Sequence, residues 1–267
     1  MQVSHFYLLA DKNEGNGMMA LIQRIGIVLG LVVSMFAQAA TENLPEVSAR
    51  FETVQCANPC KKSVEKNWWL MRTPKTLELR QVKNKAGKLA MQGEMWKYQP
   101  NGKTSYLFLM HDDKRAIEYL FDDLRILGLG VDDHQWELSS QFIADDELAA
   151  LKKSNKASKD YQGYTTEIYN GVIGEADVSM VWLPALKLPV TLEYRYPTSK
   201  TTIKLKALVA GDDLRKKSAA SPKTVAPKLA SYDHIYYTDI GDMEEDPTAQ
   251  AWIAHAAGAP GMHAHNH

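Results

Sequence analysis

Alternation of apolar and polar residues is the pattern that most constrains the fold of this chain. It occurs over residues 76–83 (TLELRQVK), 190–196 (VTLEYRY) and 202–207 (TIKLKA). A period of two places alternate side chains on opposite faces of a strand, whereas a helix needs a period of 3.6. We therefore expect an antiparallel sheet with one apolar face and one face toward solvent.

Turn residues and short helical stretches fill the space between these strands. Pro100-Asn101-Gly102 separates two strand-like segments and predicts a hairpin, because Asn-Gly favours tight turns. Residues 120–127 and 145–153 carry leucines at helical spacing. A sheet with a few helices packed on one face belongs to the α+β class, mainly antiparallel β.

The N-terminal region has the pattern of a secretory signal peptide. An apolar segment at 25–37 follows Arg24, and its last residue begins the small-residue site Ala37-Gln38-Ala39. Its thirteen residues fall short of the roughly 20 that a membrane-spanning helix needs. We expect residues 1–39 to be an N-terminal extension plus signal peptide, and the mature protein to be periplasmic and not membrane-spanning. An uncleaved anchor and a buried helix are the alternatives.

Cys56 and Cys60 are the only cysteines. In an oxidising compartment such a pair forms a disulfide, and the C-x3-C spacing closes a small loop. So short a loop removes little chain entropy, so the bond would staple a local turn. The alternative is a thiolate pair for a soft metal such as Cu(I), which would need a further ligand.

Composition divides the rest of the chain into three parts. Residues 40–210 carry the strand pattern and form the expected β domain. Residues 211–231 contain prolines but no aromatic residues, and we interpret them as a linker. Residues 232–267 begin with a strand-like segment, continue through an acidic cluster at 239–246 and end in a histidine-rich tail.

The tail is the best candidate for metal binding. Imidazoles two residues apart on a flexible chain can bind Cu(II), Ni(II) or Zn(II), and only in their neutral form. A tail that binds no metal is the alternative interpretation. The candidate ligands are His255, Met262, His263, His265 and His267.

Other polar clusters give little support for catalysis. His111-Asp112-Asp113 and Asp132-Asp133-His134 combine imidazole with carboxylates, but both follow element ends, where Asp and His are common turn formers. The acidic cluster at 239–246 lacks the ligand spacing and central glycine of a calcium loop. The chain has no phosphate-binding glycine loop, nucleophile elbow or H-E-x-x-H motif, so we expect no enzyme. Its net charge of −1 argues against nucleic-acid binding.

Aromatic and methionine residues crowd the first strands. They would either fill a closed core or line an apolar groove for a hydrophobic ligand. Residues two apart share a face, so Met95 and Trp96 cannot both face one groove in a regular strand. The candidate groove residues are Trp69, Met71, Met95, Trp96, Tyr106 and Phe108.

The order of motifs resembles the LolA-like superfamily of periplasmic lipoprotein carriers. The likeness rests on Gly163-Tyr164, Val181-Trp182, Leu188-Pro189-Val190 and residues 201–208, and covers about residues 65 to 210. It implies an unclosed, half β-barrel with short helices on the concave face as a lid over an apolar cavity.

The resemblance implies a non-enzymatic carrier whose partner is a hydrophobic small molecule or the acyl chains of a lipoprotein. The disulfide, linker and tail depart from a bare carrier. Two other functions therefore stay open: transition-metal handling by the tail, and an assembly or scaffold protein that docks an envelope partner through residues 232–246.

Overall fold

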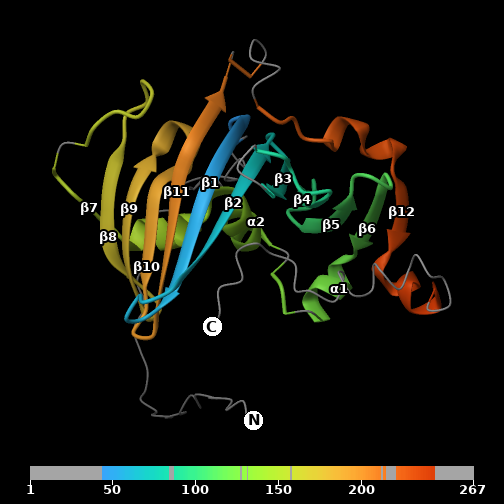
Figure 1. The fold of residues 1–267 in the computed structure, drawn as a ribbon, viewed down its shortest axis with the longest axis horizontal. Helices are drawn as coiled ribbons and strands as arrows, with labels where there is room; N and C mark the ends of the chain where they lie inside the picture. The colour runs from blue at the N-terminus through green and yellow to red at the C-terminus, as the bar shows by residue number, and fades with distance from the viewer. Residues whose placement is uncertain are drawn as a thin grey trace, which may run out of the picture. The chain divides into compact units, whose positions relative to one another are not determined.

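The computed structural model describes residues 44–83, 87–126, 128–130, 132–156, 158–211, 213–214 and 221–243. One sheet dominates this part of the chain. Its strands follow the order β12-β6-β5-β4-β3-β2-β1-β11-β10-β9-β8-β7 from edge to edge, so the sheet is open (Figure 1). The strands are β1 (Val47–Ala57), β2 (Ser63–Arg72), β3 (Thr76–Gln81), β4 (Gln92–Tyr98), β5 (Thr104–Met110), β6 (Arg115–Tyr119), β7 (Lys152–Lys153), β8 (Glu167–Ile173), β9 (Ala176–Leu183), β10 (Leu188–Arg195), β11 (Ser199–Ala210) and β12 (Asp233–Tyr236).

Two local meanders build the sheet and meet at its centre. Strands β1 to β6 pair in sequence order, and so do β7 to β11. The meanders join where β1 pairs with β11 in antiparallel fashion, from Val47 opposite Ala210 to Ala57 opposite Ser199. Strand β12 lies parallel to β6 and forms one edge of the sheet.

Short helices accompany the sheet. They are α1 (Phe121–Ile126), α2 (Asp133–Gln141) and α3 (Asp145–Ala150), with the 3-10 helices η1 (Pro184–Leu186), η2 (Ala226–Ser231) and η3 (Tyr237–Met243). None of the helices in the described ranges is long and apolar enough to cross a membrane. The architecture is the expected open, mainly antiparallel α+β fold.

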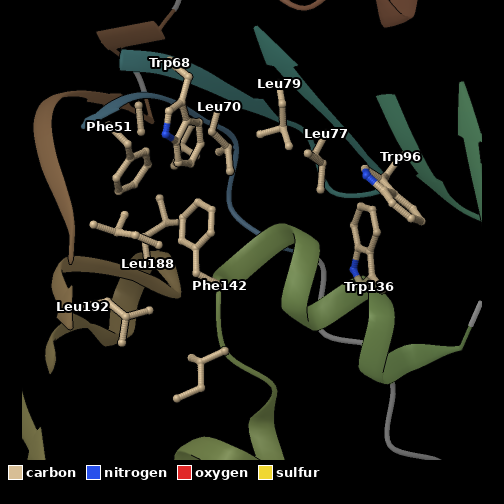
Figure 2. Close-up of a cluster of buried hydrophobic side chains, with 14 of the residues drawn as sticks. Phe51, Trp68, Leu70, Leu77, Leu79, Trp96, Trp136, Phe142, Leu188 and Leu192 are labelled. Carbon is tan, nitrogen blue, oxygen red and sulfur yellow. The ribbon is translucent and has the colours of Figure 1, made fainter. Parts of the chain in front are cut away.

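The main core lies between the helices and the sheet face that we call the inner face. Strand alternation directs Phe51, Trp68, Leu77, Trp96 and Tyr106 to this face, where all five are buried. Figure 2 shows Trp136 of α2 and the neighbouring Phe142 reaching this cluster from the helical side. The inner face therefore matches the expected apolar face.

The opposite face, called the outer face, differs from the expectation of a solvent-facing surface. Over β4, β5 and β6 it carries Met95, Leu107, Leu109 and Ala116, all fully buried. Residues 221–232, which we call the strap, cover this patch with Leu229. Part of the segment interpreted as a linker is thus packed against the sheet.

Element ends depart from the sequence pattern where turn chemistry intervenes. The alternation expected over 76–83 holds only to Arg80, because Gln81 is polar at an apolar position, and β3 ends at Gln81. The helix expected at 145–153 ends at Ala150, because Leu151 is extended and Lys152–Lys153 pair with β8 as β7. Helix α2 was not expected, since Trp136 is the single aromatic residue in its mostly polar sequence.

Candidate functional site: the lid over the inner face

An aromatic cluster marks the centre of the inner face. Phe51 stacks on Trp68 with ring centroids 5.0 Å apart. Phe142 meets both rings edge-on, at 5.0 Å from Phe51 and 5.4 Å from Trp68. Such pairs add about 0.5–1.5 kcal/mol each beyond the area that they bury. This surface is large, rigid and apolar.

The cover of this surface, residues 132–150, is called the lid. Asp132 begins it by accepting a hydrogen bond from the backbone N–H of Gln135, so α2 starts with a regular N-cap. Beyond Trp136, the buried side chains of α2 are polar: Ser139, Ser140 and Gln141. Helix α3 buries none of its own side chains. Phe142, Ile143 and Ala144 follow α2 and are also buried, so the cover of the apolar sheet face combines polar and apolar buried side chains.

Arg72 fastens the lid to the sheet. Its guanidinium donates to the backbone carbonyls of Ser140 (2.7 Å) and Leu186, and to that of Lys187 (3.2 Å). A fourth bond goes from Nε to the carbonyl of Pro45 at 3.2 Å. One buried side chain thereby ties the lid, the η1 turn and the start of the sheet together.

The charge of Arg72 has no carboxylate partner among the described residues, and its exposure is 2%. Burial lowers the pKa of Arg72 to about 9, so the group still carries its proton at neutral pH. A buried charge is tolerated where oriented dipoles replace water. The backbone carbonyls around Arg72 therefore stabilise its buried charge, and the charged side chain in turn holds the lid in place.

Phe142 is held in a strained backbone conformation at the end of α2. Its φ is 72°, in the left-handed region that a bulky side chain rarely adopts. The left-handed conformation costs roughly 1–2 kcal/mol, and the ring contacts with Phe51 and Trp68 offset it. The Tyr194 hydroxyl donates to the Phe142 carbonyl at 3.2 Å and holds the turn from the sheet side.

The six candidate groove residues divide between the two faces. Trp96, Tyr106 and Phe108 lie on the inner face, and the Trp96 and Tyr106 rings meet edge-on at 5.0 Å. Met95 lies on the outer face under the strap. Trp69 and Met71 share a second outer-face cluster with Val82. Met95 and Trp96 therefore point to opposite sides, and the structure brings together half of the set.

The strap is held by a buried carboxylate. Glu78 accepts hydrogen bonds from the Thr224 hydroxyl (2.8 Å) and the Val225 backbone N–H (2.7 Å). Its other oxygen lies 3.4 Å from Nε2 of His111, whose Nδ1 is 2.9 Å from the Tyr232 hydroxyl. Burial raises the pKa of Glu78, and burial with the charge of Arg80 lowers the pKa of His111 to about 4.

The remaining residues that the sequence suggested as sites either form structural contacts or lie outside the described residues. Cys56 and Cys60 form a disulfide. Asp132 caps α2, Asp133 accepts from the Tyr98 hydroxyl, and Nδ1 of His134 lies 3.5 Å from Asp146. In the described ranges no group of three or more His, Cys, Asp or Glu residues could hold a metal ion. Outside those ranges lie His255, Met262, His263, His265 and His267.

Sequence reasoning missed Arg72, although a signal was present. Arg72 is two residues beyond Leu70 and four beyond Trp68, so it continues the apolar phase of β2. A charged residue at an apolar position of a strand either marks the end of the buried part of the strand or is buried with hydrogen-bond partners. Glu78 had no comparable signal, because the groups around it, His111 and the strap, come from distant parts of the chain.

No protein-family model matches the chain, and no curated protein matches it. Among solved structures, it is similar to the Pseudomonas aeruginosa MucA/MucB complex, with 11% identity over 74% of this chain and 60% of that one, at a TM-score of 0.32. A putative outer membrane lipoprotein-sorting protein domain from Vibrio parahaemolyticus gives 8% identity over 66% and 92%, at 0.27. PNGF-II gives 9% identity over 75% of this chain and 34% of its own length, at 0.35.

This chain therefore spans about a third of PNGF-II and somewhat less than two thirds of the MucA/MucB chain. A lipoprotein-sorting domain, the kind of protein that the sequence resembles, is among the similar structures. At these identities and TM-scores the likenesses establish no shared function.

Proposed function

We propose that the protein is an exported, periplasmic, non-enzymatic carrier that binds a lipid or acyl chain between the inner face and the lid. The single observation that carries this proposal is the construction of the lid. An apolar, aromatic sheet face is covered by a short segment that buries the polar side chains of Ser139, Ser140 and Gln141 beside its apolar ones and is fastened through Arg72. The signal-like N-terminus supports the compartment.

The energetics of the cover favour exchange with a ligand. The large apolar side chains that the lid region inserts are Trp136, Phe142 and Ile143. Burying a side chain of this size contributes about 1.5–3 kcal/mol. An acyl chain that buries a similar apolar area against Phe51 and Trp68 would compensate for lifting them. A lid with leucines in place of Ser139, Ser140 and Gln141 would be harder to displace.

Release of the lid is expected to increase uptake of apolar probes. We would titrate the protein with the apolar dye N-phenyl-1-naphthylamine and compare wild type with Arg72→Met. The variant removes the donor to the Ser140 and Leu186 carbonyls, so it should bind the dye at least several-fold more tightly or faster. Native mass spectrometry of the gently purified protein should show a co-purified mass of several hundred daltons.

Glu78→Gln is the matched control, because it alters the cover of the outer face and leaves Arg72 in place. It should not change dye binding. If wild type and Arg72→Met both bind no dye, and the purified protein carries no lipid, the carrier proposal is wrong. An equal rise in Arg72→Met and Glu78→Gln would mean that general loosening, and not the lid, admits the dye.

A further inference from the structure

The end of the β1–β2 hairpin carries a cluster of unpaired positive charge. We call residues 57–66 the tip; all of them are exposed. Three lysines lie within it, Lys61, Lys62 and Lys66, and no ion pair involves any of them among the described residues. The one carboxylate of the tip, Glu65, accepts a hydrogen bond from the Asn67 side chain at 3.0 Å.

The backbone of the tip is fixed in place. The Cys56–Cys60 disulfide joins the two sides of the connection, with Cα atoms 5.2 Å apart. Asn58 donates through its backbone N–H to the Thr198 carbonyl (2.8 Å) and through its side chain to the Pro197 carbonyl (3.2 Å). The β1–β2 and β10–β11 hairpins therefore end together (Figure 1). Binding through a fixed surface avoids the entropy of ordering a loop.

An apolar side chain accompanies the lysines. Val64 is 60% exposed, the highest value among the large apolar residues of the two central hairpins. It shares a strand face with Lys66, because the two are two residues apart in β2. Segments that bind at a membrane surface combine basic side chains, which are attracted to anionic lipids, with apolar side chains that enter the lipid boundary.

The type of basic residue indicates the kind of partner. Arginine binds a defined carboxylate or phosphate through two parallel hydrogen bonds, and the tip contains no arginine. Lysine is a flexible point charge suited to a diffuse negative field. We propose that the tip docks the protein on the surface of an anionic lipid bilayer. This proposal goes beyond the carrier function and does not depend on it.

Vesicle binding tests this directly. The full chain would be sedimented with vesicles of phosphatidylglycerol and phosphatidylcholine in equal parts, and with pure phosphatidylcholine, which measures any binding through other apolar segments. Near an anionic surface each lysine contributes about 1 kcal/mol. Replacing all three with glutamine (Lys61→Gln, Lys62→Gln, Lys66→Gln) should weaken binding to the anionic vesicles about 100-fold. Raising the salt from 0.05 to 0.5 M should also release the wild type, because it screens exposed charges.

The matched control removes the same charge elsewhere. Lys152, Lys156 and Lys159 are exposed around β7, and their replacement by glutamine should change binding less than twofold. Val64→Ser should weaken vesicle binding several-fold without changing its salt dependence. Circular dichroism and the mass of the oxidised chain verify that each variant is folded and retains the disulfide.

Three outcomes would overturn the proposal. Equal binding to neutral and anionic vesicles would mean that the tip charges have no role. An equal loss of vesicle binding in the variant with the lysines around β7 replaced would show that the net charge of the protein, and not the tip, causes the binding. Absence of vesicle binding, together with tip-dependent binding of a polyglutamate peptide, would assign the tip to an acidic protein partner. None of these results depends on whether the inner face binds a lipid.

Discussion

The two faces of the sheet are both covered, and a buried charged side chain anchors each cover, but the chemistry is opposite. On the inner face the cation of Arg72 donates to carbonyls of the lid and the η1 turn. On the outer face the carboxyl of Glu78 accepts from an N–H and a hydroxyl of the strap. Arg72 binds only main-chain carbonyls, whereas Glu78 binds one main-chain N–H and the Thr224 hydroxyl, so the position of the strap also depends on a side chain of the strap.

The side chains that the two covers bury against the sheet differ as well. The strap inserts Leu229 over a patch of fully buried aliphatic residues. The lid inserts Trp136, Phe142 and Ile143 and also buries three polar side chains of α2. The buried polar groups of the lid must keep hydrogen-bond partners, whereas the patch under the strap is aliphatic, so the position of the lid depends on hydrogen bonds such as those of Arg72. In the proposed carrier function, the lid is the cover that opens and the strap is the cover that stays closed.

Arg72→Met should give the largest effect. It leaves the carbonyls of Ser140, Leu186 and Lys187 without their donor, and each unsatisfied buried group costs about 1–3 kcal/mol. We expect a loss of about 3–5 kcal/mol in the free energy of unfolding, measured by urea denaturation. Hydrogen exchange should accelerate in residues 133–150 more than in the strap. Equal acceleration in both would contradict separate anchoring.

Glu78→Leu should give a smaller loss, about 2–3 kcal/mol, because two strap donors lose their acceptor while the aliphatic contacts of Leu229 remain. Hydrogen exchange is expected to rise at Val225 and its neighbours and to stay unchanged in the lid. Glu78→Gln keeps an acceptor oxygen and should recover part of the loss. A Glu78→Leu variant as destabilised as Arg72→Met would remove the distinction between the covers.

The strap should also respond to pH through His111. Its pKa is lowered to about 4, so the folded protein resists a proton that the unfolded chain binds below about 6.5. Stability should therefore fall as the pH drops through this window. The raised pKa of Glu78 acts in the opposite direction, because the folded carboxyl takes up its proton at a higher pH than in the unfolded chain.

Arg80 opposes a charge on His111, whereas Asp112 favours it, and the Tyr232 hydroxyl faces the ring. We expect wild type to lose about 1 kcal/mol more than His111→Gln between pH 7 and pH 5, by urea unfolding at both values. An identical pH dependence in the two proteins would show that His111 does not titrate with folding.

The smallest effect is expected from Tyr194→Phe. It removes one hydrogen bond to the Phe142 carbonyl, worth about 0.5–1.5 kcal/mol. The change should lower stability by about that amount and speed exchange near the end of α2, without affecting the strap. Thermal unfolding and hydrogen exchange would measure both. No change in either would mean that Arg72 and the aromatic contacts alone hold the lid.

Local patterns predicted the sheet, whereas contacts between distant segments decided the site. The alternation at 190–196 and 202–207 lies within β10 and β11 apart from one residue, and Gly102 adopts a positive φ of 74° in the expected hairpin. The sequence did not predict helix α2, because Asp132-Asp133 at its start is also typical of a turn, although Asp is a common N-cap residue.

The burial of Glu78 could not be predicted from β3, where it occupies the polar phase. It depends on a strap that has no periodic pattern of its own. Likewise, alternation showed that Met95 and Trp96 face opposite ways but not which of them would meet the lid.

The pairing of β1 with β11 has a consequence for the order of folding. These neighbours at the centre of the sheet are separated by more than 140 residues of chain. When the chain becomes available for folding from its N-terminus onward, the β1–β6 meander can form early. The free edge of β1 stays unpaired until residues 199–210 follow. The β6 edge waits longer still, for β12. Unpaired edges invite association between chains. We therefore expect a half-delivered chain to be the species most in need of a chaperone.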